Sequence, residues 1–153
     1  PNEKKVTFYE KADRSIFKII DTSTAELKKL NGQFTNDQYW LTFPLHLQWD
    51  EGYTLTDNDT ATGPVTEKKY HKYTIQYNGK DGFTPGDMYE LYTDDKYMIQ
   101  EWAFHKTAAN DPTVMATWED YGDFGGLKIA KEHKSKDGKF RLHFTGITVE
   151  QQN

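Results

Sequence analysis

The stretch that most constrains the fold is residues 83–106, which has the pattern of two strands joined by a short turn. Thr84-Pro85-Gly86-Asp87 predicts a tight turn near its start, since proline fixes φ and glycine accepts positive φ. Apolar and polar side chains then alternate along 88–93 and again along 97–106, with the polar Asp94-Asp95-Lys96 between them. Alternation with a period of two is typical of strands that bury one face. We therefore predict a β-hairpin here, with further strands beside it.

Similar alternating segments occur along most of the chain, separated by Gly, Pro, Asn and Asp. They predict a mainly β protein of about eight to ten strands. Connections in the second half are short, and Asp137-Gly138 is typical of a hairpin turn, so an antiparallel meander is expected. The polar residues 57–69 are predicted to form a surface loop. Besides the hairpin, the predicted strands lie within residues 4–20, 39–49, 53–55, 70–78, 114–121, 127–133 and 140–149.

Residues 39–49 show the strongest alternation in the chain, because every second position from Tyr39 to Trp49 is apolar. This pattern predicts a strand with one apolar face. Pro44 cannot donate a hydrogen bond within a sheet, so this strand is expected to lie at an edge, to be bulged or to bend. One short helix is predicted just before it, capped by Asp21–Thr24 and ended by Asn31-Gly32.

Composition agrees with a sheet that has an apolar face. Only 35% of residues are hydrophobic, yet 15% are aromatic, and aromatic residues favour strands. The net charge of −5 argues against a nucleic-acid partner, since phosphate contacts need a basic surface. The chain has no cysteine, which excludes disulfides, thiolate metal sites and cysteine nucleophiles.

The length of 153 residues corresponds to one domain, so residues 1–153 are predicted to form a single domain. No run of about 20 apolar residues, the length that crosses a bilayer, is present. The sequence starts Pro1-Asn2-Glu3 without methionine. We interpret this start as a processed or truncated product from which a targeting segment was removed.

Three segments, FPLHLQWD (43–50), TPGDMYELY (84–92) and WEDYGDFGGLK (118–128), resemble an uncharacterised envelope family. That family is common in Bacteroidetes and is related to the outer-membrane lipoprotein carriers of the LolA-like superfamily. The resemblance covers roughly residues 39–150. It implies a curved antiparallel sheet, or half-barrel, whose concave face receives acyl chains, and a periplasmic or envelope location. The carriers begin with a long amphipathic helix, so the family's N-terminal helix and first strands are expected to be missing here.

A ligand site is therefore predicted on the apolar face of the sheet. Large apolar side chains at these positions favour a lipid or another apolar ligand, although the same residues could also form an ordinary core. No cofactor is expected. The predicted ligand-binding residues are Tyr39, Leu41, Phe43, Leu45, Leu47, Trp49, Tyr89, Leu91, Trp102, Phe104 and Trp118.

No catalytic or metal site is predicted from the polar residues. None of the five histidines has helical metal-binding spacing, and four of the five alternate with apolar neighbours and are expected to face solvent. Four acidic residues lie near aromatic ones, a combination found in glycosidases, but nothing in their spacing shows that two carboxylates converge. These acids are Glu101, Glu119, Asp120 and Asp123.

Three hypotheses for function follow, in this order. The first is a non-enzymatic envelope protein that binds a lipid, a lipoprotein acyl chain or another apolar ligand, with peripheral association with the membrane. The second is an interaction module that packs the same apolar face against a partner chain or a second copy of itself. The third is a protein that binds or cleaves carbohydrate.

Overall fold

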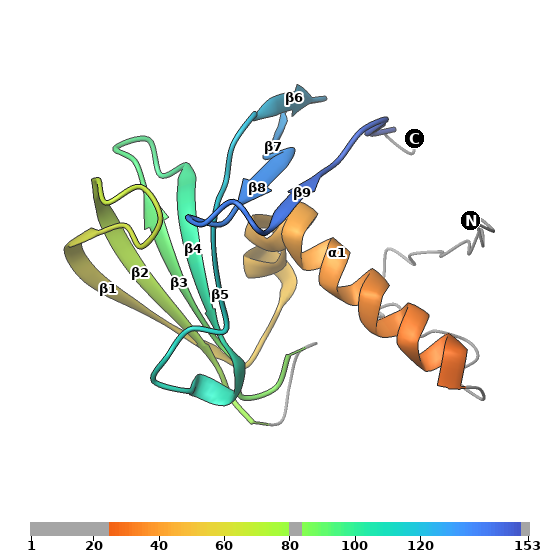
Figure 1. Cartoon of the computed structure of the whole chain (residues 1–153), viewed down its shortest axis with the longest axis horizontal. Helices are drawn as coiled ribbons and strands as arrows, with labels where there is room; N and C mark the ends of the chain where they lie inside the picture. Colours follow the sequence, from red (N-terminus) through yellow and green to blue (C-terminus); the bar gives the residue numbers. More distant parts are fainter. Residues whose placement is uncertain (1–24, 80–83, 151–153) are drawn as a thin grey trace. The chain divides into compact units, whose positions relative to one another are not determined.

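The computed structural model describes residues 25–79 and 84–150. The chain divides into two compact units between Trp49 and Asp50. Within the described residues the first unit contributes one α-helix and the second contributes antiparallel sheets, so the predicted mainly β character is confirmed (Figure 1). The strands predicted within residues 4–20 lie outside the described residues. No helix in the described part of the chain is both long and apolar enough to cross a membrane.

Helix α1 spans Ala25–Trp49, so the strand predicted at 39–49 is wrong. The short helix predicted before it is confirmed at residues 25–30, but its predicted end at Asn31-Gly32 is wrong. The residues predicted to cap it, 21–24, lie outside the described residues. The alternation suggested a strand, but apolar residues at every second position also include apolar residues at every fourth position, such as 39, 43 and 47. Four residues are close to one turn of helix, so the same apolar pattern suits a helix. Gly32 does not end the helix, since an interior glycine costs only about 1 kcal/mol.

One stripe of α1 is buried. It consists of Tyr39, Trp40, Phe43 and His46, a spacing that places them along one side of a helix. The ring of Tyr39 lies 5.8 Å from that of Phe43 and stacks on His46 at 4.6 Å. Pro44 lies inside the helix, where it supplies no N–H to the turn before it.

The second unit contains a five-stranded antiparallel sheet in which the strands follow their order along the chain. The predicted meander and the predicted hairpin of residues 88–93 and 97–106 are therefore confirmed (Figure 1). The prediction of a loop at 57–69 is wrong for residues 57–62, which belong to the first strand, and for residue 69, which begins the second. The strands are β1 (Tyr53–Thr62), β2 (Lys69–Tyr77), β3 (Met88–Thr93), β4 (Ile99–His105) and β5 (Val114–Thr117).

Local turn chemistry explains the hairpin at the middle of this sheet. Asp87 N–H donates to the carbonyl of Thr84 at 3.0 Å, and Gly86 has a φ of 79°, as the turn predicted there requires. Between β3 and β4, the carboxylate of Asp94 accepts the backbone N–H groups of Lys96 and Met98. The turn before β3 and the turn between β3 and β4 are therefore formed by the residues from which they were predicted.

Two short hairpins follow the sheet. Their strands are shorter than the strands predicted at 127–133 and 140–149. The Asp137-Gly138 turn is confirmed, with a φ of 69° at Gly138. A short 3-10 helix, η1 (Lys106–Ala108), connects towards β5. The hairpin strands are β6 (Gly122–Phe124) with β7 (Leu127–Ile129), and β8 (Glu132–Lys134) with β9 (Arg141–His143).

The register of the five strands gives the sheet two different faces. Cross-strand pairs such as Ile75 with Tyr89 and Leu91 with Trp102 place large apolar side chains on one side. The alternate positions carry charged and polar side chains to the other side, which we call the polar face. We call the first side the aromatic face and define it as Ile75, Tyr77, Tyr89, Leu91, Trp102, Phe104 and Trp118.

Candidate functional site

A continuous series of rings crosses the aromatic face. Tyr77 meets Tyr89 edge-on at 6.0 Å, Tyr89 lies 5.3 Å from Trp102, and Trp102 meets Trp118 edge-on at 5.3 Å. Trp118 then contacts His133 of β8 at 4.7 Å. These separations and tilts suit the quadrupoles of aromatic rings. The series therefore forms one packed aromatic layer that extends from β2 to the second short hairpin.

The sheet brings together five of the predicted ligand-binding residues. Tyr89 pairs with Phe104, and Leu91 pairs with Trp102. Trp118 lies on the same side, two residues beyond Ala116, the partner of Trp102. Four of the five are buried, and only Phe104 is half-buried. The sequence alternation was therefore sufficient to place this group on one face.

The other six predicted residues belong to helix α1 and not to a strand, so their expected alignment along one strand face is wrong. Tyr39 and Phe43 are buried within the helical stripe described above. The remaining four lie at other positions of the same helix, Leu41, Leu45 and Leu47 half-buried and Trp49 as its last residue.

Trp118 has an unusual polar environment within the aromatic layer. Its side chain is 2% exposed, and no described residue accepts a hydrogen bond from its indole N–H. The neighbouring His133 differs, because its Nδ1 lies 3.0 Å from the carbonyl of Thr117 and must donate to it. A buried donor without an acceptor costs about 1–3 kcal/mol. Trp118 thus offers a hydrogen bond to a group that enters this layer.

The polar face carries a partly buried network around Glu90. Lys72 Nζ donates to Glu90 at 2.6 Å and the hydroxyl of Tyr92 donates at 2.9 Å. Burial raises the pKa of Glu90, but the hydrogen bonds from Lys72 and Tyr92 outweigh it and hold the pKa below its ordinary value. His105 donates through Nδ1 to Ala109 and faces Glu90 with Nε2 at 3.7 Å. Glu90 thus accepts hydrogen bonds from Lys72 and Tyr92, which hold its carboxylate in place on the polar face.

The prediction that four of the five histidines face solvent is wrong, because three of the five are buried. His46, His105 and His133 are buried, with 3%, 4% and 0% of their surfaces exposed, whereas four of the five histidines were expected to face solvent. Nδ1 of His105 lies 2.8 Å from the carbonyl of Ala109 and Nδ1 of His133 lies 3.0 Å from the carbonyl of Thr117, and the ring of His46 stacks on Tyr39. Within residues 25–79 and 84–150, no group of three or more His, Asp or Glu side chains is arranged to hold a metal ion.

Glu101 is a fully buried carboxylate that holds the loop between β1 and β2. Its exposure is 0%, and it accepts the backbone N–H groups of Val65 at 2.7 Å and Thr66 at 3.0 Å. The hydroxyl of Thr66 donates to the same carboxylate. Three donors compensate for much of the cost of burying the charge. The sequence showed Glu101 only as a polar position opposite the apolar ones, and its structural role was missed.

The four acidic residues considered for glycoside chemistry each bind a different partner. Glu101 holds the β1–β2 loop, as described. Glu119 pairs with Lys134 at 3.1 Å, Asp120 with Lys131 at 2.9 Å and Asp123 with Lys128 at 2.7 Å. Each of these acids therefore has its own partner, and the described contacts do not pair two of their carboxylates with each other.

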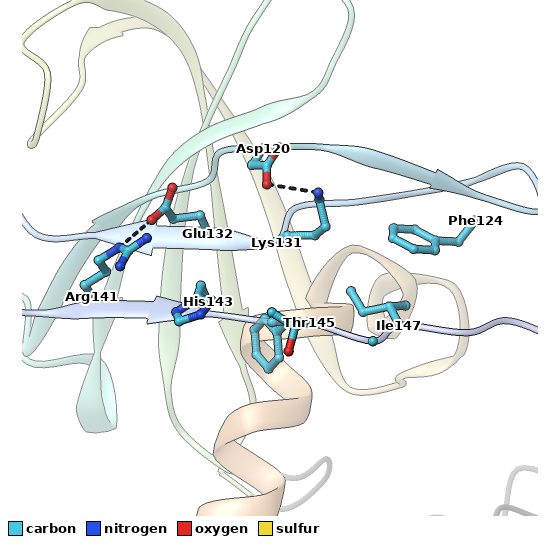
Figure 2. A pocket seen from close by; sticks show the side chains of 10 residues that line it. Asp120, Phe124, Lys131, Glu132, Arg141, His143, Thr145 and Ile147 are labelled. Carbon is cyan, nitrogen blue, oxygen red and sulfur yellow. Dashed lines mark hydrogen bonds and ion pairs between the residues drawn. The ribbon is translucent and has the colours of Figure 1, made fainter.

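A cavity of about 400 Å³ lies beside the two short hairpins, within the range of pockets that bind small molecules. Figure 2 shows Asp120 and Lys131 along one side, with Thr145 and Ile147 along the other and Phe124 at one end. Glu132 and Arg141 form an ion pair at the opposite end. The residues that line the cavity are Asp120, Phe124, Lys131, Glu132, Arg141, His143, Phe144, Thr145, Gly146 and Ile147.

Comparison with protein-family models, with curated proteins and with solved structures gave no match.

Gly63 provides a test of the contact between the β1–β2 loop and Glu101. A Cβ at this position would lie 2.7 Å from Oε1 of Glu101, so Gly63→Ala is expected to lower the free energy of unfolding by about 1–3 kcal/mol. Gly79→Ala is the matched control, because nothing lies within 4 Å of its added Cβ. The control is expected to be neutral or to stabilise by about 0.4–1 kcal/mol. Urea denaturation of both variants measures the difference, and equal stabilities would contradict this placement of the loop.

Proposed function

We propose that this protein binds an apolar ligand, such as the acyl chain of a lipid or lipoprotein, against the aromatic face, and that it catalyses no reaction. The observation that supports this proposal is the continuous layer of rings from Tyr77 to Trp118. Such a layer offers a long apolar surface without charged groups. Each methylene of a chain that leaves water contributes about 0.8 kcal/mol, so the driving force for binding grows with the length of the acyl chain.

The burial of the aromatic face sets a condition on binding. Tyr89 and Trp102 are 2% and 3% exposed, so their rings are already covered by other groups. A ligand that binds there replaces these neighbours with its own apolar atoms. The driving force then comes from the ligand's own transfer out of water, and it must exceed the cost of opening the layer. The unpaired indole N–H of Trp118 gives the ligand's polar group a hydrogen bond that the described residues do not supply.

The sequence resemblance supports the same proposal. It implies a half-barrel, in which the sheet curves around the ligand, and a periplasmic or envelope location with peripheral access to membranes. The ligand would then be a lipid or the acyl part of a lipoprotein. The runner-up is an interaction module that packs the aromatic face on another chain or on a second copy.

Quenching of tryptophan fluorescence tests the proposal. In a Trp40→Phe, Trp49→Phe double variant, the two remaining indoles are Trp102 and Trp118, both on the aromatic face. Titration with 9,10-dibromostearate is expected to quench their emission in a saturable way, because bromine quenches indoles only at short range. Unbrominated stearate should compete with the quencher without quenching.

Two single substitutions on adjacent strands provide the matched comparison. Phe104→Glu places a charge on the half-buried edge of the aromatic face and is expected to weaken binding at least about tenfold. Met115→Glu places the same charge on the polar face, where Met115 is 39% exposed, and should leave binding unchanged. Absence of saturable quenching, or equal loss in both variants, would exclude the aromatic face as the ligand site.

A further inference from the structure

The cavity beside the short hairpins has a charge-balanced wall. Asp120 and Lys131 form one ion pair at 2.9 Å, and Glu132 and Arg141 form a second at 2.5 Å. Hydrogen bonds from Arg141 and Lys134 hold the pKa of Glu132 below its ordinary value, so this carboxylate is ionised at neutral pH. Two negative and two positive charges therefore cancel along the wall. A wall of this kind does not favour an anion or a cation over a neutral ligand.

The same wall retains hydrogen-bonding capacity. The ion pair with Glu132 uses Nε of Arg141, and a guanidinium has four further N–H groups. Arg141 is 60% exposed at its side chain, so these groups are accessible from the solvent. Thr145 and His143 add a hydroxyl and an imidazole to the lining. The cavity can thus donate to and accept from several hydroxyl groups at once.

The remaining lining is apolar. Phe124, Phe144 and Ile147 face the cavity together with the polar groups, and Figure 2 shows Phe124 and Ile147 near one end. Gly122 allows this position of Phe124, since a Cβ on Gly122 would lie 2.6 Å from the phenyl ring. Phenyl rings supply a flat apolar contact surface beside the polar wall.

We propose that this cavity is a carbohydrate-binding site for a neutral sugar of one or two residues, separate from the aromatic face. A sugar ring has hydroxyl groups around its edge and an apolar C–H face, which match the ion-paired wall and the phenyl rings respectively. A purely apolar ligand would displace the water that hydrogen-bonds to the ion pairs. It would offer no hydrogen bonds in return, which costs free energy. A charged ligand would be attracted to one member of each pair and repelled by the other, so its charge gains little there. A neutral polyhydroxylated ligand replaces the lost hydrogen bonds and needs no net charge on the wall.

Saturation-transfer NMR with maltose, cellobiose, lactose and N,N′-diacetylchitobiose tests this inference, with palmitate and inorganic phosphate as comparison probes. At least one saccharide is expected to bind. Arg141→Met and Phe124→Ala should each weaken that binding about tenfold, the effect of losing one good polar or stacking contact. Absence of saccharide binding, or binding of palmitate or phosphate alone, would overturn the proposal.

Two controls separate a site effect from a general loss of structure. Lys139→Met removes a cation from the turn of the same β8–β9 hairpin, where Lys139 is 86% exposed and pairs with Asp137. Leu127→Ala truncates a residue that does not line the cavity, although it is the cross-strand partner of Phe124. Both controls should stay within about twofold of the parent protein, since surface changes have small effects. Equal losses in the controls would overturn the proposal, and Arg141→Met decides the outcome if Phe124→Ala fails to fold.

Discussion

Replacement of Glu101 by alanine is expected to lower the free energy of unfolding by about 3–5 kcal/mol, the range found when one partner of a buried charged contact is removed. The carboxylate is fully buried, and it accepts the backbone N–H groups of Val65 and Thr66 together with the hydroxyl of Thr66. Its loss leaves these three donors without an acceptor and opens a void on the polar face. Urea denaturation followed by circular dichroism measures the change.

Two further variants identify the cause of that loss. Glu101→Gln keeps an acceptor of the same size and is expected to cost less, about 1–3 kcal/mol, because one of the donors then faces an amide NH₂. Glu119→Ala removes an acid that is 40% exposed and paired with Lys134, so it should cost no more than about 1 kcal/mol. Hydrogen exchange should show faster exchange at Val65 and Thr66 only in the Glu101 variants. A loss below about 1 kcal/mol for Glu101→Ala would contradict the assigned role.

Replacement of Trp102 by alanine is expected to destabilise the protein by about 3–5 kcal/mol, as large-to-small changes in packed cores do. Trp102 is 3% exposed and packs between Tyr89 and Trp118, each with its ring centre 5.3 Å away. The substitution removes the middle of the ring series and leaves a cavity that its neighbours can fill only in part.

Met115→Ala is the matched control for Trp102→Ala. Met115 lies on the neighbouring strand, faces the opposite side of the sheet and is 39% exposed, so a change of less than about 1 kcal/mol is expected. Guanidinium denaturation of both variants gives the comparison. A similarly small change for Trp102→Ala would mean that its ring borders a void instead of packed neighbours.

The sheet could be predicted because its signals are local. The alternation along β3 and β4, the Pro85-Gly86 turn and the Asp137-Gly138 turn each act over a few residues, and the structure contains all of them. The grouping of Tyr89, Leu91, Trp102, Phe104 and Trp118 on one face followed from the same alternation.

The errors arose where one pattern fits two structures or where the partner is distant in sequence. At residues 39–49 every second residue is apolar, so every fourth residue is apolar as well. The first spacing suits a strand and the second suits a helix, and the pattern alone does not distinguish a strand from α1. Glu101 meets Val65 and Thr66 across 36 and 35 residues, and no local signal announces such a contact. The cavity likewise combines residues from Asp120 to Ile147, whose proximity depends on how two hairpins fold.

Native mass spectrometry of the protein purified from cells without detergent, followed by denaturation and organic extraction, tests the central claim most directly. The proposal predicts an added mass that equals an acyl species recovered in the organic phase. That mass should be lost in Phe104→Glu and retained in Met115→Glu. A ligand-free monomer would contradict binding of an apolar ligand, and a ligand-free dimer would instead assign the aromatic face to an interface between two copies of the chain.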